Sequence, residues 1–152
     1  MKLVVMIPAY NEEKSIGKLI EAIPRDTSID ETKILVIDDG STDSTVSVSK
    51  KFGADVILSN GSNRGLGFTF QRGIDYAIRI GADIIVNIDA DGQFNPADIP
   101  KLISPIQKDD ADMVTCSRFL SKDLVPSMPF LKKVGNRIFT FLVNRLVKGR
   151  YT

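Results

Sequence analysis

The chain has 152 residues, with 20 Lys and Arg against 19 Asp and Glu, one cysteine and no histidine. This length suits one domain with its own core. The composition excludes an intramolecular disulfide, a Ser-His-Asp triad and a histidine-ligated metal. Any chemistry must depend on carboxylates, amides, hydroxyls, Lys, Arg or the thiol of Cys116, and oxygen ligands favour hard cations.

Charge is divided unevenly along the chain. Residues 1–117 carry 12 basic and 18 acidic side chains, a net charge of −6, whereas residues 118–152 carry 8 basic and one acidic, a net charge of +7. The basic segment is short and interleaved with aliphatic residues, which argues against nucleic acid as a partner. The first apolar run stops at Pro8, too short for a signal sequence, and no run approaches the roughly 18 apolar residues of a membrane span.

Short apolar runs alternate with stretches of helical period, which predicts an α/β fold with a mainly parallel sheet flanked by helices. Runs rich in Val, Ile and Leu are typical of strands covered on both faces. Five strands are expected, at Lys2–Ile7, Lys33–Asp38, Asp55–Ser59, Asp83–Ile88 and Asp112–Ser117. Helices are expected at Ser15–Ile23, Ser44–Phe52, Phe68–Ile80 and Ala97–Ile106.

A last, amphipathic and basic helix is predicted over Lys132–Val147. It has two interpretations: a helix that packs on a core with a solvated basic edge, or a helix that lies on an anionic membrane surface near lipid phosphate. Its apolar stripe is Val134, Ile138, Phe141, Leu142 and Leu146, flanked by Lys132, Lys133, Arg137 and Arg145.

Two carboxylates follow the fourth expected strand, in Asp89-Ala90-Asp91. Ligands of open parallel sheets bind beyond the carboxyl ends of the strands, and side chains at i and i+2 can point to the same side. Gly92 allows a turn that adds the amide oxygen of Gln93. This set suits Mg²⁺ or Mn²⁺ with a substrate phosphate. The alternative is an Asp-rich turn that merely ends the strand.

The first two expected strands also end in polar segments. In Asp38-Asp39-Gly40-Ser41-Thr42-Asp43 the later residues can cap the next helix, while Asp39 could accept hydrogen bonds from a nucleotide base. In Pro8-Ala9-Tyr10-Asn11-Glu12-Glu13, Tyr10 offers a ring for stacking and Glu12 an acceptor for a ribose hydroxyl. The Pro8–Glu13 segment is equally well explained as the start of a helix with acidic residues in its first turn.

Asn63-Arg64-Gly65-Leu66-Gly67 precedes the third expected helix. It either lets backbone approach a ligand, with Arg64 near phosphate, or forms an ordinary loop. A dinucleotide-binding fingerprint is rejected, because Phe70 occupies its third glycine position. Arg118, after the fifth expected strand, is either a phosphate clamp or a surface charge.

Together and in this order, the four motifs resemble glycosyltransferase family 2 with the GT-A fold, and within it the dolichol-phosphate mannosyltransferases and polyprenyl-phosphate glycosyltransferases. The resemblance runs from Met1 to about Arg118. It implies a nucleotide-sugar-binding core at 1–118 and a partial acceptor-side segment at 119–152. The implied reaction is inverting transfer of mannose or glucose, from GDP-mannose or UDP-glucose, to polyprenyl or dolichyl phosphate.

The resemblance also implies roles for individual residues. Asp89, Asp91 and Gln93 would hold Mg²⁺ or Mn²⁺ on the diphosphate, and Arg118 would join both aspartates in catalysis. The residues implied around the donor are Pro8, Ala9, Tyr10, Glu12, Ile37, Asp39, Gly67, Asp89, Ala90, Arg118 and Lys132.

The acceptor decides which catalytic groups are needed. A lipid phosphate is already ionised at neutral pH, whereas a sugar hydroxyl requires a carboxylate base, and no residue after Asp123 is acidic. Related catalytic domains extend further, so we expect this chain to be a donor-binding half located at the cytoplasmic membrane face, with possible homo-oligomers through the last helix. The alternatives are a non-catalytic nucleotide-sugar-binding module and a transferase with a saccharide acceptor. A nucleotidyltransferase is disfavoured, because Pro8–Glu13 is not a basic glycine-rich loop.

Overall fold

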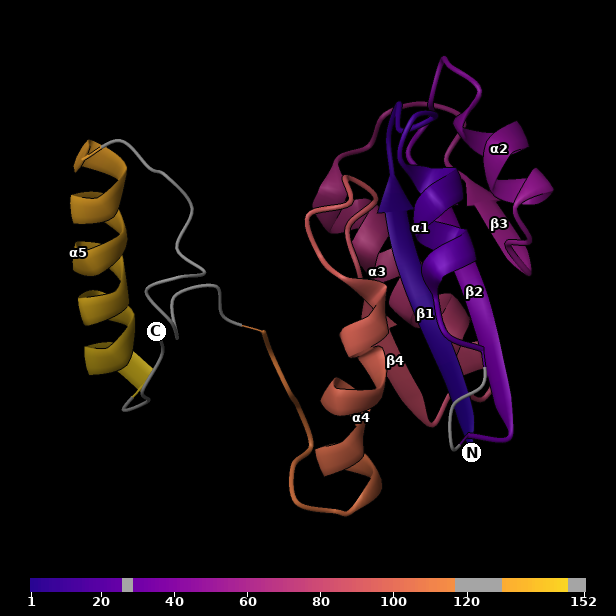
Figure 1. Ribbon diagram of the computed structural model, residues 1–152. Helices are drawn as coiled ribbons and strands as arrows, with labels where there is room; N and C mark the ends of the chain where they lie inside the picture. Colours follow the sequence, from indigo (N-terminus) through magenta and orange to yellow (C-terminus); the bar gives the residue numbers. More distant parts are fainter. Residues whose placement is uncertain (26–28, 117–129, 148–152) are drawn as a thin grey trace. The chain divides into compact units, whose positions relative to one another are not determined.

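The computed structural model describes residues 1–25, 29–116 and 130–147. The chain forms two compact units, Met1–Val114 and Thr115–Thr152, each of which is described by itself (Figure 1). The domain boundary predicted at Arg118 stays a prediction, because residues 117–129 lie outside the described ranges.

A parallel sheet forms the centre of the first unit, with the strand order β3-β2-β1-β4. β1 lies between β2 and β4, so that Val5 sits beside Ile34 on one side and Val86 on the other. All side chains from Leu3 to Ile7 are fully buried, as expected for a strand covered on both faces. The strands are β1 (Lys2–Ala9), β2 (Glu31–Asp38), β3 (Val56–Ser59) and β4 (Ile84–Asn87).

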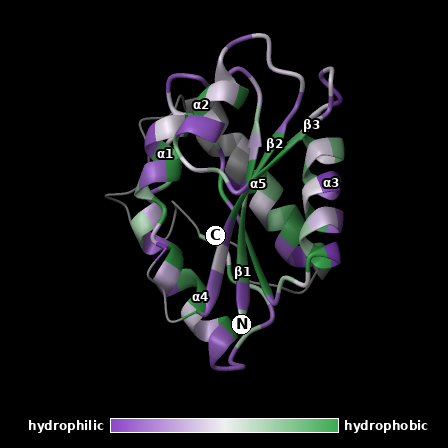
Figure 2. Cartoon of the chain, turned by 90° about the vertical axis from the view of Figure 1, so that its right-hand side faces the viewer, coloured by the Kyte–Doolittle hydropathy of each residue, from purple (hydrophilic) through white to green (hydrophobic). Residues whose placement is uncertain are grey.

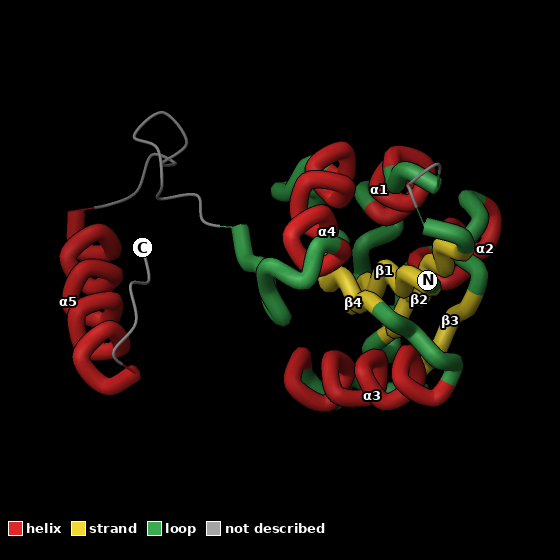
Figure 3. The backbone as a smooth tube through the Cα atoms, turned by 90° about the horizontal axis from the view of Figure 1, so that it is seen from below, coloured by secondary structure: helices red, strands yellow, loops and turns green. Residues whose placement is uncertain are grey.

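Helices cover both faces of the sheet (Figure 3). One face carries α1 (Ile16–Ala22), α2 (Thr45–Lys51) and α4 (Ile99–Gln107), the last preceded by the 3-10 turn η1 (Pro96–Asp98), and the other carries α3 (Leu66–Arg79). Successive residues of β1 therefore enter two different cores. Leu3, Val5 and Ile7 pack with α1 and α4, and Val4 and Met6 pack with α3. The apolar strands lie between these helices in Figure 2.

The α/β architecture expected from the sequence is confirmed, with small shifts in the element ends. β1 runs two residues further than expected, to Ala9, because Pro8 and Ala9 still pair with Ile37 and Asp38 of β2. The expected helix Ala97–Ile106 is divided, since η1 precedes α4.

The fifth strand expected at Asp112–Ser117 is wrong over the residues that can be compared. Residues 111–116 form no ladder with any described strand, and Met113 is 76% exposed. An apolar run becomes a strand only when its backbone groups find a partner. The described part of the chain provides none for this run, and Ser117 lies outside it.

The second unit contains α5 (Phe130–Val147), which confirms the last predicted helix. The side chains of Lys132, Lys133 and Val134 lie outside the described ones. Among the side chains that the structure describes, no helix has the length and apolarity needed to span a bilayer. The exposed apolar side chains of α5 are Ile138, Phe139, Phe141, Leu142 and Leu146.

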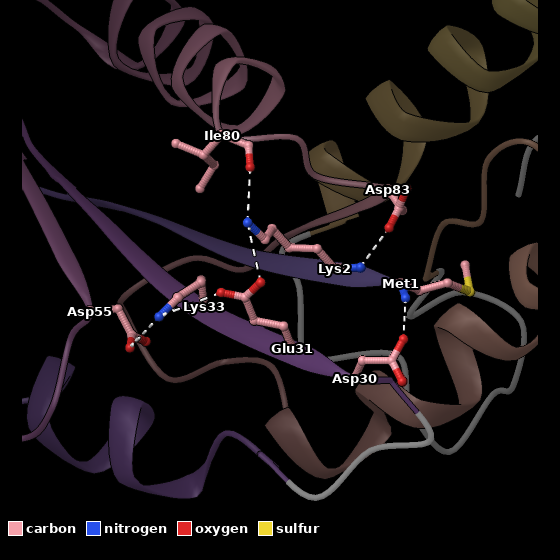
Figure 4. Close-up of polar contacts among 8 residues, drawn as sticks. All are labelled: Met1, Lys2, Asp30, Glu31, Lys33, Asp55, Ile80 and Asp83. Atoms are coloured by element: carbon pink, nitrogen blue, oxygen red, sulfur yellow. Dashed lines mark hydrogen bonds and ion pairs between the residues drawn. The ribbon is translucent and has the colours of Figure 1, made fainter.

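Charged residues gather where the strands begin, at the edge opposite the polar strand ends (Figure 4). The Lys2 ammonium lies 3.2 Å from Glu31 and donates to the Ile80 carbonyl at 3.0 Å, while the Lys2 backbone N–H donates to Asp83 at 2.6 Å. Exposed ion pairs contribute roughly 0–1 kcal/mol each. This cluster therefore assists strand pairing but is secondary to the apolar cores.

Two glycines of α3 test how closely this helix packs on the sheet. A Cβ at Gly73 would lie 2.2 Å from Met6 Sδ and 2.9 Å from Ile37 Cδ1, whereas a Cβ at Gly67 would meet no atom within 4 Å. We expect Gly73→Ala to lower the free energy of unfolding by about 1–3 kcal/mol through overpacking. Gly67→Ala should raise it by up to about 1 kcal/mol through helix propensity. Urea unfolding measures both, and equal effects would contradict the packing of α3.

Candidate functional site

Hydrogen bonds join the β1–α1 loop to the β2–α2 loop at the carboxyl edge of the sheet. The backbone N–H of Asn11 donates to Ser41 Oγ at 2.9 Å, and the Asn11 side-chain oxygen accepts from the Thr42 N–H at 2.8 Å. Asn11 has a φ of 55°, in the left-handed region that Asn tolerates better than most residues. The backbone conformation of Asn11 and its side-chain oxygen therefore both stabilise the contact between the loops.

Three further hydrogen bonds continue this contact. The Glu12 N–H donates to Thr45 Oγ1 at 2.8 Å and the Glu13 N–H donates to Asp43 at 3.1 Å, while the Glu13 carboxylate accepts from the Ser44 N–H at 2.9 Å. The N-cap of α2 is Ser44, which makes no side-chain capping bond, so the cap predicted among Ser41, Thr42 and Asp43 is displaced by at least one residue. Asp43, just before it, accepts from the Thr45 N–H at 2.9 Å, the first N–H of α2. Burial would raise the pKa of Asp43, but hydrogen bonds from Thr45 and Glu13 lower it below its ordinary value.

Asp39 connects the β2–α2 turn to the loop that precedes α3. Its side chain is 5% exposed. Oδ1 accepts from Asn60 Nδ2 at 2.7 Å and from the Arg64 N–H at 2.9 Å, and Oδ2 accepts from the Gly65 N–H at 2.9 Å. Burial would raise the pKa of Asp39, but hydrogen bonds from Arg64, Asn60, Thr69 and Gly65 outweigh it and lower this pKa. Asp39 is thus a buried, ionised carboxylate that orders the loop.

The same loop packs directly on Gly40. A Cβ at this position would lie 2.4 Å from the carbonyl carbon of Ser62 and 2.8 Å from the backbone nitrogen of Asn63. Gly40 also has a φ of +78°, which favours glycine. Space and backbone conformation therefore both require glycine, and segments 8–13, 38–43 and 60–65 form one interlocked assembly.

A cavity of about 200 Å³ opens beside this assembly. It brings together four residues predicted to contact a donor, Pro8, Ala9, Tyr10 and Asp39. Tyr10 is 45% exposed and so presents a ring at the cavity. The complete lining is Pro8, Ala9, Tyr10, Asp39, Asn63, Gly65, Leu66 and Thr69.

Other predicted donor residues do not line this cavity. The Glu12 carboxylate accepts from the Ser15 hydroxyl at 2.6 Å, and Ile37 is fully buried in the core beneath α3. Gly67 lies in the first turn of α3. The Arg64 guanidinium lies 4.5 Å from the centre of the Phe68 ring. The roles assigned to these residues stay predictions.

The chain beyond β4 presents the paired carboxylates. The Ile88 N–H still donates to the Met6 carbonyl at 3.0 Å, so the backbone continues along β1. Ile88 and Ala90 are 4% and 3% exposed, whereas Asp89 and Asp91 are both exposed. This alternation is the arrangement predicted from their i, i+2 spacing.

The turn after these carboxylates is compact, since Gly92 has a φ of +74° and Asp91 Oδ1 accepts from the Gln93 N–H at 2.9 Å. No group of three or more acidic or cysteine side chains suited to a metal gathers in the part of the chain that the structure describes. Two carboxylates are nevertheless enough for Mg²⁺, which retains water and phosphate ligands. The exposed oxygens of Asp89 and Asp91 therefore fit a divalent cation. Arg118 and the Lys132 side chain lie outside the described residues.

Sequence reasoning missed Asn60 and Thr69. Asn60 Nδ2 donates both to Asp39 at 2.7 Å and to Thr69 Oγ1 at 2.9 Å, so it holds the wall of the cavity together. Asn60 directly follows β3, and the rule that examines residues after each strand would have found it. Thr69 is inside a helix and leaves no comparable signal.

Comparisons with known proteins identify the family of the chain and several relatives. The model of the family described as Glycosyl transferase family 2 matches residues 4–150. An uncharacterized protein of Methanocaldococcus jannaschii is 36% identical over 93% of this chain and 56% of its own length. The UDP-N-acetylglucosamine–dolichyl-phosphate N-acetylglucosaminyltransferase of Methanococcus voltae is 33% identical over 97% of this chain and 63% of its own length. The chain thus spans less than two thirds of these relatives.

A solved structure is also similar. It is glucosyl-3-phosphoglycerate synthase from Mycobacterium tuberculosis in complex with Mn²⁺, UDP-glucose and phosphoglyceric acid. Its TM-score is 0.57 at 30% sequence identity, over 69% of this chain and 39% of that chain.

The lowered pKa of Asp39 gives its contribution to stability a defined pH dependence. A carboxylate whose pKa is below the ordinary 3.8 stabilises the fold above pH 3.8 and loses this effect as the pH falls through its native pKa. Asp39→Asn should lower the free energy of unfolding by about 1–3 kcal/mol at neutral pH, because an amide cannot accept on both sides.

Urea unfolding at neutral pH and over an acid series measures this difference, which should shrink as the pH falls below about 4. Asp110→Asn, at an exposed position of the same unit, is the matched control and should show no such difference. A loss for Asp39→Asn that is constant with pH would contradict an ionised Asp39.

Proposed function

The chain belongs to glycosyl transferase family 2, and on this premise we propose that it takes part in transferring a hexose from a nucleotide-sugar donor to polyprenyl or dolichyl phosphate, with inversion at the anomeric carbon. GDP-mannose and UDP-glucose are the proposed donors. The observation that carries the proposal is the convergence, at one sheet edge, of the cavity around Asp39 and the exposed pair Asp89 and Asp91.

The cavity is proposed as the site of the base and ribose. Its volume of about 200 Å³ is below the roughly 300–1,000 Å³ of complete small-molecule sites. The cavity therefore has room for a base but not for a whole nucleotide sugar. A carboxylate offers about four acceptor positions, and Asp39 uses three of them on Asn60, Arg64 and Gly65. The Thr69 hydroxyl also bonds to Asp39, so a base N–H would share one of these positions at the wall of the cavity.

Asp89, Asp91 and Gln93 are proposed to hold Mg²⁺ or Mn²⁺. The metal, when bound, would supply positive charge against the charge that develops on the leaving diphosphate. The exposed carboxylates of Asp89 and Asp91 leave room for water and phosphate beside it. The complex of the mycobacterial synthase with Mn²⁺ and UDP-glucose supports this assignment. Arg118 is proposed as a further positive charge near the diphosphate.

The proposed acceptor is a lipid phosphate, an ionised nucleophile that needs no general base. The relative from Methanococcus voltae, whose name specifies dolichyl phosphate, supports this choice. α5 adds exposed Phe139, Phe141 and Leu142 beside Arg137 and Arg145, a composition suited to an anionic lipid surface. We therefore place the protein at the cytoplasmic face of a membrane. A second candidate acceptor is a soluble phosphate, because the mycobacterial synthase was solved with phosphoglyceric acid.

The donor site is tested by thermal shift with UDP-glucose and GDP-mannose, each with and without Mn²⁺. A ligand at 100 times its Kd stabilises the folded state by about 2.7 kcal/mol, so the matching nucleotide sugar should raise the Tm by several degrees. Asp91→Asn should abolish the Mn²⁺-dependent part of the rise, because a neutral amide is a poor ligand for a hard cation.

Asp110→Asn is the control and should keep the full rise, since this exposed residue lies outside the site. A parent chain whose Tm responds to no nucleotide sugar, with or without Mn²⁺, would contradict the donor site. Transfer of labelled sugar to a short polyprenyl phosphate then separates a transferase from a module that only binds the donor.

A further inference from the structure

A second hollow, of about 360 Å³, lies between α1 and the segment that follows β4. We call it the lysine groove. Its volume falls within the range of roughly 300–1,000 Å³ that is typical of small-molecule sites. None of the residues predicted to contact the donor or the metal lines it. The lining residues are Lys14, Ser15, Lys18, Leu19, Ala22, Gly92, Phe94 and Pro96.

Two cations border the lysine groove. Lys14 lies in the turn before α1 and Lys18 lies in α1, and both side chains are exposed. Neither ammonium forms an ion pair with any residue in the described ranges. The acids nearest to Lys14 in the sequence are bound elsewhere, since the Glu12 carboxylate accepts from Ser15 and the Glu13 carboxylate accepts from Ser44. Glu21, three residues after Lys18, is exposed and forms no ion pair with it in the described ranges. The groove therefore offers two positive charges to an anion.

The remaining wall is apolar. Leu19 is 4% exposed and Phe94 packs against the core formed with α1 and α4, so both are fixed in place. Ala22 and Pro96 also line the groove. A cationic rim beside an apolar wall complements an amphipathic anion, whose charged head pairs with ammonium and whose chain covers carbon.

The lysine groove adjoins the candidate metal site. Gly92, which lines the groove, lies between Asp91 and Gln93 in the chain. The β1–α1 loop borders both hollows, with Tyr10 at the donor cavity and Lys14 and Ser15 at the groove. A molecule in the groove would therefore have its charged end close to the segment proposed to hold the donor diphosphate.

We propose that the lysine groove binds the polyprenyl phosphate acceptor, with its phosphate at Lys14 and Lys18 and its first isoprene units on Leu19, Ala22 and Phe94. This inference rests on the proposed function. An ionised phosphate oxygen attacks the anomeric carbon, the bond from that carbon to the diphosphate breaks, and the electron pair leaves with the nucleoside diphosphate. No proton needs to be transferred, and the two lysines are positioning residues.

The test is isothermal titration calorimetry of the full chain with farnesyl phosphate as the probe. The double variant Lys14→Gln/Lys18→Gln should bind about tenfold more weakly than the parent, because it loses charge-assisted contacts to phosphate. Lys50→Gln/Lys108→Gln removes the same charge from exposed positions outside the groove and should bind like the parent. Ala22→Glu, which places an acid at an exposed position of the groove, should also weaken binding.

Farnesol and 3-phosphoglycerate separate the two parts of the ligand, and both should bind more weakly than farnesyl phosphate. Farnesol binding as tightly as farnesyl phosphate would overturn the role of the lysines, and equally tight 3-phosphoglycerate would make the groove a soluble-phosphate site. Unchanged affinity in the lysine double variant, or no binding to the parent, overturns the inference.

Thermal shift with the nucleotide sugars, run on the same variants, separates this inference from the proposed function. The groove variants should keep the nucleotide response of the parent, and its loss in them would assign the lysines to the donor site instead. A parent without any nucleotide response contradicts the proposed function, whatever the result with farnesyl phosphate.

Discussion

The buried carboxylate of Asp39 is the interaction on which the arrangement of the site depends. An ionised group at 5% exposure is unfavourable unless hydrogen bonds compensate it, and here they come from Asn60, Arg64 and Gly65. The loop before α3 thus keeps the charge satisfied, and the charge keeps the loop in place. Without Asp39 or the loop before α3, the cavity beside Tyr10 would lose one wall.

The sheet determines where such polar groups can stand. β1 has neighbours on both edges and helices on both faces, so its side chains stay buried from Leu3 to Ala9. At the carboxyl edge, polar side chains become accessible at the last residues of β3 and β4, Ser59 and Asn87, and beyond the strand ends at Tyr10, Asp89 and Asp91. The extent of the apolar core therefore locates the candidate site at the carboxyl edge of the sheet.

Sequence reasoning succeeded where the signal is local. The apolar runs of β1, β2 and β4 and the i, i+2 pair Asp89 and Asp91 carry their structure in neighbouring residues. It failed at the run from Asp112, because a strand depends on a partner that periodicity does not reveal. It also assigned Glu12 to a ribose without foreseeing its bond to Ser15, and it did not foresee a groove shared by Lys14 and Phe94, which only folding brings together.

The contact of Gly40 with Ser62 and Asn63 has a kinetic consequence. It joins segments that are more than 20 residues apart, across β3, so closing the loop costs chain entropy that the contact must offset. A nucleotide that binds only the closed cavity must be released before this part of the chain opens, so it would slow unfolding and make the occupied protein kinetically more durable.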